Sequence, residues 1–412
     1  MHKDGCAYRI DKQLSNQGLQ QHALLLQTFL LESPRKMSQF RFLSSLICVV
    51  LLTACSTTDL TKQTSTTEIT IFSINDFHGN LQSDKPVPYL ASTADPHDTE
   101  KHLTTPAGGY AYLAGLLKER RKLVGASILV GGGDLIGASP MGSALLKDEP
   151  VIEALNQLDL QVTAVGNHEF DKGTAELQRK IHGQCPPAGC VFPDFHGAKF
   201  TYLGANVFEK GDKNPWLPPY AIRDVGGMKI GFIGAVTTDV PNLVAGDAVK
   251  KMSFEDEATA INRYVPELQK QGVAAIVLLI HEGATYKGAA NDPTYRCKGL
   301  QGPIIDIVKK LDKAISLVIS AHTHQAYTCK IDGHLVVQGK SYGAYLTEST
   351  LTIDTRMHTV VKAEAKNILV DQQKVNADPT AQKLVRQVEQ QTNKMRQQFV
   401  AMVDAPLKVE SE

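Results

Sequence analysis

The sequence predicts an α/β protein whose sheets are covered by helices, and three observations favour this fold class. Strand-like and helix-like segments alternate along most of the 412-residue chain, which is typical of helix-covered sheets. Hydrophobic residues make up 42% and charged residues 21% of the chain, as in ordinary globular proteins. Five short apolar runs end in histidine, aspartate or asparagine. Because ligands of α/β sheets collect beyond the carboxyl ends of the strands, we expect a polar site there.

Each element is expected from its own local pattern. Aliphatic runs predict strands over residues 69–74, 127–130, 162–165, 229–236, 274–280 and 315–319. Apolar residues at helical spacing predict helices over residues 109–124, 149–158, 174–181, 255–271 and 304–311. The polar segment 82–107 predicts a long surface loop, and residues 335–338 and 346–353 predict a closing antiparallel portion.

The charge balance argues against a polyanionic partner. Lysine and arginine total 43, aspartate and glutamate total 43, and the net charge is zero. Proteins that bind nucleic acid usually carry a basic excess. We therefore expect a small-molecule substrate and no nucleic-acid polymer, and the sequence leaves the oligomeric state open.

Residues 1–55 are typical of a leader and an export signal. Arg35, Lys36 and Arg41 precede an apolar stretch over residues 42–52. This stretch is shorter than the about 20 residues of a membrane-spanning helix, and small residues follow it, as in a secretory signal. Met37 lies at the usual distance before such a signal, so we expect translation to start there.

The end of the signal resembles a bacterial lipobox, Leu52-Thr53-Ala54-Cys55. This resemblance implies cleavage before Cys55 and a diacylglycerol group on it; the alternative is a plain secretion signal with an incidental cysteine. Ser56 is similar to the residue that directs lipoproteins to the outer membrane. We expect a lipid-anchored protein that faces the periplasm of a Gram-negative bacterium. Residues 56–67, with eight serines or threonines in twelve, predict a flexible tether.

Four cysteines remain beyond the lipidation residue. They are Cys185, Cys190, Cys297 and Cys329. An even number in an exported protein favours disulfides, and four cysteines allow three pairings. A bond between Cys185 and Cys190 would close a small loop and leave Cys297 with Cys329. The alternative is a zinc site, although no C-x-x-C pair is present.

The five apolar runs end in side chains that can bind metal ions. These candidate ligands are Asp76, His78, Asp134, Asn167, His281, His322 and His324. Alternate residues of an extended strand point to the same side, so Asp76 and His78 can hold one cation. Taken alone, Asp134 could instead be a helix N-cap. A single buried histidine is usually a core residue. Together, nitrogen and oxygen ligands without cysteine favour an open metal centre over a structural zinc site.

The segment Gly166-Asn167-His168-Glu169-Phe170-Asp171 is the strongest single motif. His168 follows a candidate ligand directly, so its ring should point elsewhere, toward a substrate. Asp171 lies three residues later and can hold the tautomer and charge of His168. We interpret His168 and Asp171 as catalytic and Glu169 as structural; the alternative is a turn with a satisfied histidine.

The number of candidate ligands predicts a centre with two metal ions. If Asp134 bridges, each metal receives four protein ligands, which leaves room for a shared water. Two divalent ions and two aspartates give a charge of about +2, which attracts phosphate, and such pairs activate water for displacement at phosphorus. Protonated His168 could assist the leaving oxygen. The ligand types suit Zn, Mn or similar ions.

These motifs resemble the calcineurin-like metallophosphoesterases, and within them the bacterial 5′-nucleotidase and UDP-sugar hydrolase group. The resemblance covers residues 68–368 and includes all five motifs in order. It implies a four-layer αββα sandwich and a catalytic His168–Asp171 pair. It assigns one metal to Asp76, His78, Asp134 and His324, and the other to Asp134, Asn167, His281 and His322. It also places Cys297 and Cys329 where some members carry a disulfide.

The C-terminal part departs from the two-domain members of this family. Asp378 and Pro379 predict the start of a helix, and its stripe includes Leu384, Val388 and Phe399. We interpret residues 377–412 as a linker helix and the truncated start of a nucleotide-binding domain. The stripe is expected either to dock on the core or to be left partly exposed.

We predict metal-dependent hydrolysis of phosphate esters, most simply of nucleoside 5′-phosphates and also of UDP-sugars. Two alternatives stay open at this point. One is a metal-binding remnant without activity, favoured by the expected truncation. The other is a broad phosphodiesterase that acts on 2′,3′-cyclic nucleotides.

Overall fold

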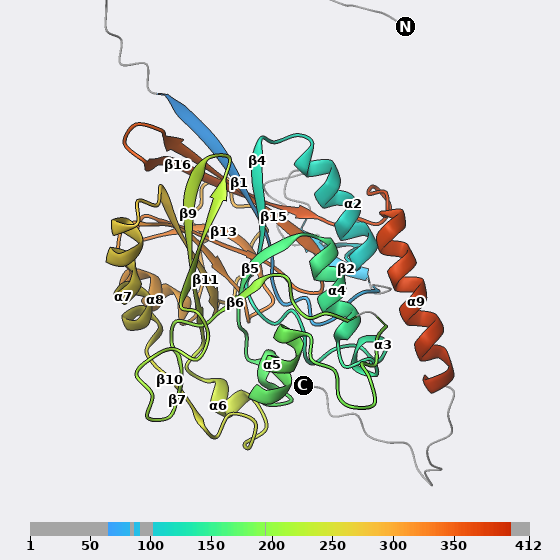
Figure 1. Cartoon of the computed structure of the whole chain (residues 1–412). Coiled ribbons are helices and arrows are strands. Elements are labelled where there is room, and N and C mark those ends of the chain that lie inside the picture. The colour runs from blue at the N-terminus through green and yellow to red at the C-terminus, as the bar shows by residue number, and fades with distance from the viewer. Residues whose placement is uncertain (1–64, 83–85, 91–101, 194, 397–412) are drawn as a thin grey trace, which may run out of the picture. The chain divides into compact units, whose positions relative to one another are not determined.

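A computed structural model describes residues 65–82, 86–90, 102–193 and 195–396, and in it two six-stranded sheets form the framework (Figure 1). The first sheet has the order β16-β15-β1-β4-β5-β6. Its strands are β1 (Thr66–Ile74), β4 (Ala126–Gly131), β5 (Leu160–Ala164), β6 (Thr201–Leu203), β15 (Tyr345–Asp354) and β16 (Thr359–Leu369). Strands β1, β4, β5 and β6 are parallel, and β15 and β16 continue the sheet in antiparallel fashion.

The second sheet has the order β13-β14-β12-β11-β9-β8. Its strands are β8 (Tyr220–Val225), β9 (Met228–Val236), β11 (Ala275–His281), β12 (Ile315–Ser320), β13 (Ala326–Ile331) and β14 (His334–Gly339). The four central strands are parallel, and β8 and β13 pair antiparallel at the edges. Parallel strands bring their carboxyl ends to one edge, which is where the site forms.

Both faces of the central strands are buried, and the sequence alternation of each strand divides its side chains between two cores. In β1, Ile69 and Ile71 belong to a core between the sheets, while Phe72 and Ile74 face the helices on the other side. Side chains of a strand alternate between the two faces of its sheet. Burial on both faces explains why these strands read as continuous apolar runs.

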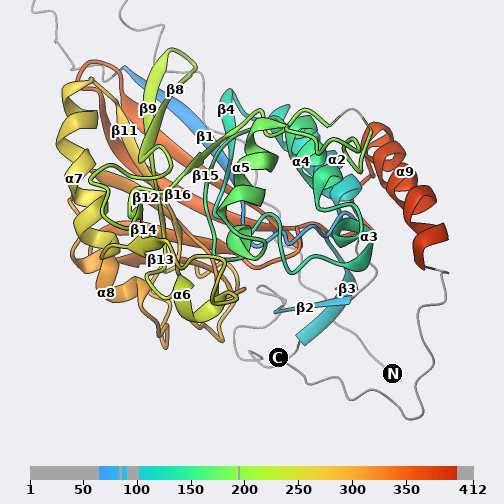
Figure 2. The same ribbon diagram turned by 60° about the horizontal axis from the view of Figure 1, so that its bottom comes forward.

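Helices cover the outer face of each sheet, which gives the expected four-layer αββα arrangement (Figures 1 and 2). The helices that pack on the first sheet are α2 (Tyr110–Arg121), α4 (Glu149–Gln157), α5 (Thr174–His182) and α9 (Pro379–Arg396). Those that pack on the second sheet are α7 (Glu257–Lys270) and α8 (Ile304–Lys309). The short helices are α3 (Met141–Ala144), η1 (His168–Phe170) and α6 (Val240–Leu243). The predicted fold class is confirmed.

The structure differs from two predictions of local structure. The expected surface loop over 82–107 contains an antiparallel pair, β2 (Pro86–Leu90) and β3 (His102–Pro106). The two segments expected to form a closing antiparallel portion do form strands with antiparallel neighbours, β14 with β13 and β15 with β1 and β16, but they lie in different sheets. A further ladder joins β7 (Val207–Glu209) to β10 (Met252–Phe254).

The N-terminal predictions lie largely outside the described residues. These are the leader, Cys55 and most of the expected tether. Strand β1 begins at Thr66, slightly before the expected start of the globular part. Among the helices of the described ranges, none combines the length and the apolarity that a bilayer span requires.

The described residues contain two disulfides, Cys185–Cys190 and Cys297–Cys329, with Cα–Cα distances of 4.7 Å and 5.6 Å. The predicted cysteines are therefore paired with each other, and the alternative of a cysteine zinc site was wrong. The second bond ties the loop before α8 to β13 across 32 residues of chain.

Helix α9 docks on the core of the first sheet rather than leaving its apolar stripe exposed. Asp378 caps the helix, because its carboxylate accepts hydrogen bonds from the backbone N–H groups of Thr380 and Ala381. Leu384 and Val388 are buried among residues of α2 and α4. The expectation of partial exposure was wrong for these two side chains, and Phe399 lies outside the described residues.

Replacing Leu384 by alanine should destabilise the protein by about 2–5 kcal/mol, since it removes a side chain buried between α9 and the core. Met395 serves as the matched control on the same helix, because 38% of it is exposed, and Met395→Ala should cost much less. Urea unfolding of both variants measures the difference. Equal losses of stability would contradict the docking of α9.

Candidate metal centre

The seven predicted ligands lie together at the carboxyl ends of strands from both sheets. Strands β1, β4 and β5 of the first sheet lead into Asp76, Asp134 and Asn167. Strand β11 of the second sheet ends at His281, and β12 leads into the loop of His322 and His324. Three groups of side chains have potential ligand atoms within 4.8 Å of one another: Asp76, His78 and His324; His78, Asp134 and His168; Asp134, His281 and His322.

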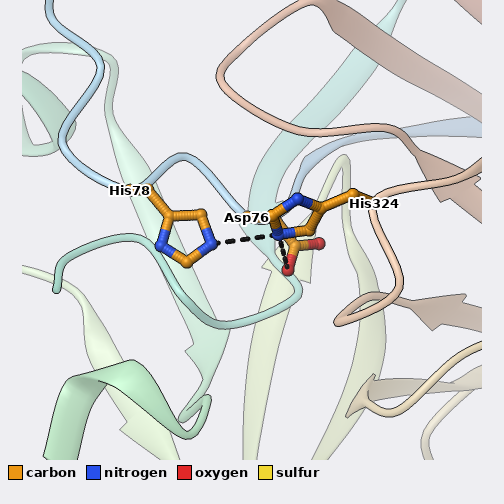
Figure 3. Close-up of side chains that lie close together, drawn as sticks. All are labelled: Asp76, His78 and His324. Carbon is orange, nitrogen blue, oxygen red and sulfur yellow. Dashed lines mark hydrogen bonds and ion pairs between the residues drawn. The ribbon is translucent and has the colours of Figure 1, made fainter. Parts of the chain in front are cut away.

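In the first group, two imidazoles converge on one carboxylate. Figure 3 shows the rings of His78 and His324 pointing toward each other, with the carboxylate of Asp76 beside them. The two Nε2 atoms are 3.1 Å apart, and the Nε2 of His324 is 3.5 Å from Asp76. Asp76 is buried completely and His78 almost so. The three ligand atoms thus surround one small volume that a cation could fill.

The group of Asp134, His281 and His322 centres on His281, which is completely buried. Its Nε2 atom lies 3.0 Å from the amide oxygen of Asn167 and 3.0 Å from the carboxylate of Asp134. His322 completes the group, and its ring centroid is 5.1 Å from that of His281. Asp134 also reaches His78 at 3.7 Å, so one carboxylate lies between both groups.

Hydrogen bonds to carbonyl groups orient two of the histidines. The Nδ1 atom of His78 lies 3.0 Å from the carbonyl of Gly137, and that of His281 lies 3.0 Å from the carbonyl of Gly132. A carbonyl only accepts, so in each ring Nδ1 carries the proton and Nε2 faces the cluster. Histidines that bind metals show this arrangement, in which the second nitrogen donates to a neighbouring group.

Burial and charge set the protonation of the cluster. Burial lowers the pKa of His78, and it lowers the pKa of His322 and His324 to about 4, so these rings are neutral with free lone pairs at neutral pH. Burial would also lower the pKa of His281, but the charge of Asp134 and the hydrogen bond to it raise this pKa to about 10. Burial raises the pKa of Asp76 to about 7. Protons on these two residues compete with a cation, because ligands must be deprotonated to bind.

Five of the seven candidate ligands have a left-handed backbone conformation. The φ angle is positive at Asp76 (48°), His78 (46°), Asp134 (49°), His322 (72°) and His324 (54°). A non-glycine residue in the left-handed region costs about 1–3 kcal/mol in such settings, and these residues cluster at functional sites. The left-handed conformation therefore supports a functional role for these loops, and aspartate and histidine are residue types that adopt it more readily than most.

Close approach of backbone segments requires glycine next to the cluster. A Cβ atom on Gly166 would lie 2.1 Å from the carboxylate oxygen of Asp134 and 2.4 Å from its backbone nitrogen. A Cβ atom on Gly133 would lie 2.7 Å from the ring of His281. These glycines let the loops after β4 and β5 touch, which places Asp134 between the two groups.

His168 stands beside the cluster and is held by Asp171, as predicted. Its Nδ1 atom donates to both carboxylate oxygens of Asp171 at 3.0 Å and 3.1 Å. The backbone N–H of Ala138 donates to the same carboxylate. Burial lowers the pKa of His168, but the hydrogen bond to Asp171 and the charge of Asp134 outweigh this and raise it to about 9. The ring is thus protonated at neutral pH, with Nε2–H available to a bound molecule.

The structure shows that two further residues position the ligands, and the sequence pattern did not predict this role for either of them. Glu169 is buried and accepts backbone hydrogen bonds from Asp134 (2.9 Å), Leu135 (2.8 Å) and Gly166 (2.7 Å). Its carboxylate thereby ties the loop after β4 to the loop after β5. The structural interpretation of Glu169 predicted no such partners, because its neighbours are distant in sequence.

Asn75 has a similar role in the loop after β1. Its amide donates to the carboxylate of Asp76 and to the carbonyl of Lys340, each at 2.6 Å, and it accepts from the N–H of Gly339. The ring of Tyr342, which lies in the loop between β14 and β15, packs edge-on against His78 and His324. Only the position of Asn75 directly before Asp76 could have suggested its role from sequence.

Comparisons with known proteins agree with this geometry. The family model described as calcineurin-like phosphoesterase matches residues 69–326. The match begins in β1 and ends two residues after His324, so it includes every candidate ligand.

Similar proteins share this part of the chain. The chain is 34% identical over 319 residues to Endonuclease YhcR of Bacillus subtilis (strain 168), covering 77% of this chain and 25% of that protein. It is 26% identical over 309 residues to the 2′,3′-cyclic-nucleotide 2′-phosphodiesterase/3′-nucleotidase of Yersinia enterocolitica, covering 69% and 41%. The chain therefore spans less than half the length of these curated relatives.

A solved structure shows the same fold. The 5′-nucleotidase precursor of Thermus thermophilus matches with a TM-score of 0.61 and 20% identity, over 81% of this chain and 61% of that chain. At this level of identity the likeness concerns the arrangement of sheets and helices.

Replacing Gly166 by alanine should destabilise the protein by about 1–3 kcal/mol, since the new methyl group collides with Asp134 in a packed interior. Gly246 is the control, because nothing lies within 4 Å of a Cβ atom built there, and Gly246→Ala should leave stability nearly unchanged. Chemical denaturation compares the two variants. A Gly166→Ala protein as stable as the control would show that Asp134 does not depend on this contact.

Proposed function

The chain belongs to the calcineurin-like phosphoesterase family, and we propose that it hydrolyses phosphate esters of nucleotides, of the 5′-nucleotidase type, with UDP-sugars as further substrates. One observation carries this proposal. Asp134 lies between two groups of buried acceptor atoms, one with Asp76 and His78, the other with Asn167 and His281. This arrangement suits two divalent cations bridged by one carboxylate.

We assign one cation to Asp76, His78, Asp134 and His324, and the second to Asp134, Asn167, His281 and His322. The donor set consists of carboxylate, amide and imidazole groups, which suits Zn, Mn or similar ions. When bound, two such ions would supply positive charge to the phosphate oxygens and lower the pKa of water. The fold contributes rigid loops from both sheets, whose strained conformations keep the acceptors converged.

His168 is proposed to act on the leaving group. Water adds to phosphorus and releases one proton to solvent, the ester P–O bond breaks, and the leaving oxygen takes the proton from Nε2 of His168. A proton from solvent then restores the charged ring. Asp171 holds the opposite nitrogen and keeps the ring charged. Proton transfer by a positioned side chain contributes roughly 10²–10⁴-fold to such reactions.

Two other interpretations carry less support. An inactive remnant would have no need of the His168–Asp171 pair, which the chain retains with the whole ligand set. A phosphodiesterase acting on 2′,3′-cyclic nucleotides is supported by the name of the Yersinia enterocolitica relative. Such an enzyme would use the same centre, and assays with both ester classes separate the two.

Replacement of His168 by alanine should reduce phosphate release from 5′-AMP by about 10²–10⁴-fold, because the leaving oxygen loses its proton donor. His182 on α5 provides the control, since it is exposed and lies outside the cluster, and His182→Ala should retain full activity. Phosphate release is measured with Mn²⁺ or Zn²⁺ and after chelation, which should abolish it. Chelator-resistant release, or an unaffected His168→Ala enzyme, would contradict the proposal.

We further propose that the protein is exported and anchored in the outer membrane, facing the periplasm, through a lipid on Cys55. Paired cysteines support an oxidising compartment, because disulfides persist mainly outside the cytosol. Wild-type protein should label with radioactive palmitate and sediment with outer membranes, whereas Cys55→Ser should do neither. A labelled Cys55→Ser variant would contradict lipidation at this residue.

A further inference from the structure

A pocket of about 520 Å³ opens beside His168, on the side of the first sheet where α3, α4 and α5 meet. This volume lies within the range of roughly 300–1,000 Å³ that small-molecule sites occupy. Its wall includes the catalytic pair and the residues Ser139, Lys147, Asp148, Lys172 and Lys180. His168 belongs both to this wall and to the group with His78 and Asp134. The pocket is therefore next to the candidate metal centre.

Most negative charges in the pocket wall are already engaged by partners. Asp171 accepts from His168, and Glu169 accepts from backbone N–H groups. Glu176 is held by a two-pronged hydrogen bond with Arg179, at 2.8 Å and 2.9 Å. A carboxylate that is fully engaged in this way repels an incoming anion less than a free one does.

Two lysines of the wall, in contrast, form no ion pair within the described part of the chain. Lys147 and Lys172 are exposed, and neither has a carboxylate partner within 4.0 Å among the described residues. Lys147 lies in a tight turn with a positive φ angle of 53°, directly before Asp148 of the same wall. Neither ammonium is held at ion-pair distance, so both are free to turn toward an anion in the pocket, although the charge of Lys147 also acts on Glu176 of the same wall.

The floor of the pocket holds buried polar groups with incomplete partners. Lys180 is 5% exposed, and its ammonium lies 3.5 Å from Asp148 and 4.0 Å from Glu176. Both distances exceed the about 2.7–2.9 Å of a charge-assisted hydrogen bond. One carboxylate oxygen of Asp148, which lines the pocket, is buried without a hydrogen-bond partner in the described part of the chain. The ammonium of Lys180 can therefore donate to a further acceptor such as a phosphate oxygen, whereas the free oxygen of Asp148 requires a donor such as water.

We propose that this pocket binds a second phosphate group carried by the leaving group of the ester, so that the preferred substrates are nucleotides with two phosphate groups. This inference rests on the proposed function, in which the leaving oxygen lies at His168. The alcohol part of such an ester extends past His168 into the pocket. There Lys147, Lys172 and Lys180 offer compact positive charges, which suit phosphate.

Hydrolysis of 5′-AMP and of adenosine 3′,5′-bisphosphate tests the proposal, because the two differ by one phosphate group. The wild-type enzyme should show the higher kcat/KM for the bisphosphate. In a double variant, Lys147→Glu with Lys172→Glu, this preference should fall by about tenfold or more, as expected for lost contacts to a charged group. The value for 5′-AMP should change much less. Both lysines are exposed, so the variant should fold.

Lys270→Glu is the matched control, because Lys270 is an exposed lysine on α7 over the other sheet, and the preference should be unchanged there. Titration calorimetry in the presence of chelator gives a second readout, since it detects the pocket without turnover. The bisphosphate should bind more tightly than 5′-AMP, and the double variant should lose that difference.

The outcomes separate the two proposals. A preferred binding of the bisphosphate without hydrolysis of either nucleotide would remove the proposed function and keep the pocket as an anion site. Equal kcat/KM values and equal binding affinities for the two nucleotides would overturn the pocket proposal. An equal loss of the preference for the bisphosphate in Lys270→Glu would also overturn the pocket proposal, since the effect would then come from net charge alone.

Discussion

The structure depends on one electrostatic constraint, the convergence of buried acceptor atoms at the edge of two sheets. Carboxylates, an amide oxygen and imidazole nitrogens face one another within a few ångströms, with Asp134 in the middle. Such atoms repel each other unless protons or cations lie between them. Burial raises the pKa of Asp76, and the charge of Asp134 raises that of His281, so both residues hold protons more readily than usual in this cluster. Divalent cations bound among these atoms would relieve the repulsion, and the ligand types suit such ions.

The fold holds these acceptor atoms together because they lie on loops between strands that are stabilised by their apolar cores. Each strand that leads into the site is buried on both faces, so its end has little freedom to move. Strained residues such as His322 persist because the surrounding structure determines them. Glu169 and Asn75 join loops from different strands through backbone hydrogen bonds. The apolar cores thus stabilise a polar site that contributes little stability of its own.

Much of this arrangement could be predicted from the sequence, because the signals were local. The apolar runs before Asp134 and His281 identify strands, and polar residues at their ends identify the site. Pairings between distant segments could not be predicted. The assignment of β14 and β15 to different sheets depends on contacts with β12 and β1, and the local pattern of an apolar strand is the same in either sheet. For the same reason, the partners of Glu169 became visible only in three dimensions.

The docking of helix α9 and the pocket beside His168 also depend on contacts between distant segments, so they could not be predicted from the sequence. The apolar stripe that includes Leu384 was recognisable, but whether it met a partner depended on α2 and α4. Lys147 and Lys180 are ordinary charged residues in the sequence, and only folding brings them to one wall with His168. The proposed substrate preference therefore rests on contacts between distant segments, which the sequence alone does not show.

Anomalous diffraction from crystals soaked in Mn²⁺ tests the central claim most directly, because it locates cations without relying on activity. We predict two peaks, one among Asp76, His78 and His324, and one among His281, His322 and the amide of Asn167, with Asp134 between them. A cluster that shows no peak at saturating Mn²⁺ would contradict the account. A single peak that leaves one group held only by internal hydrogen bonds would contradict it equally.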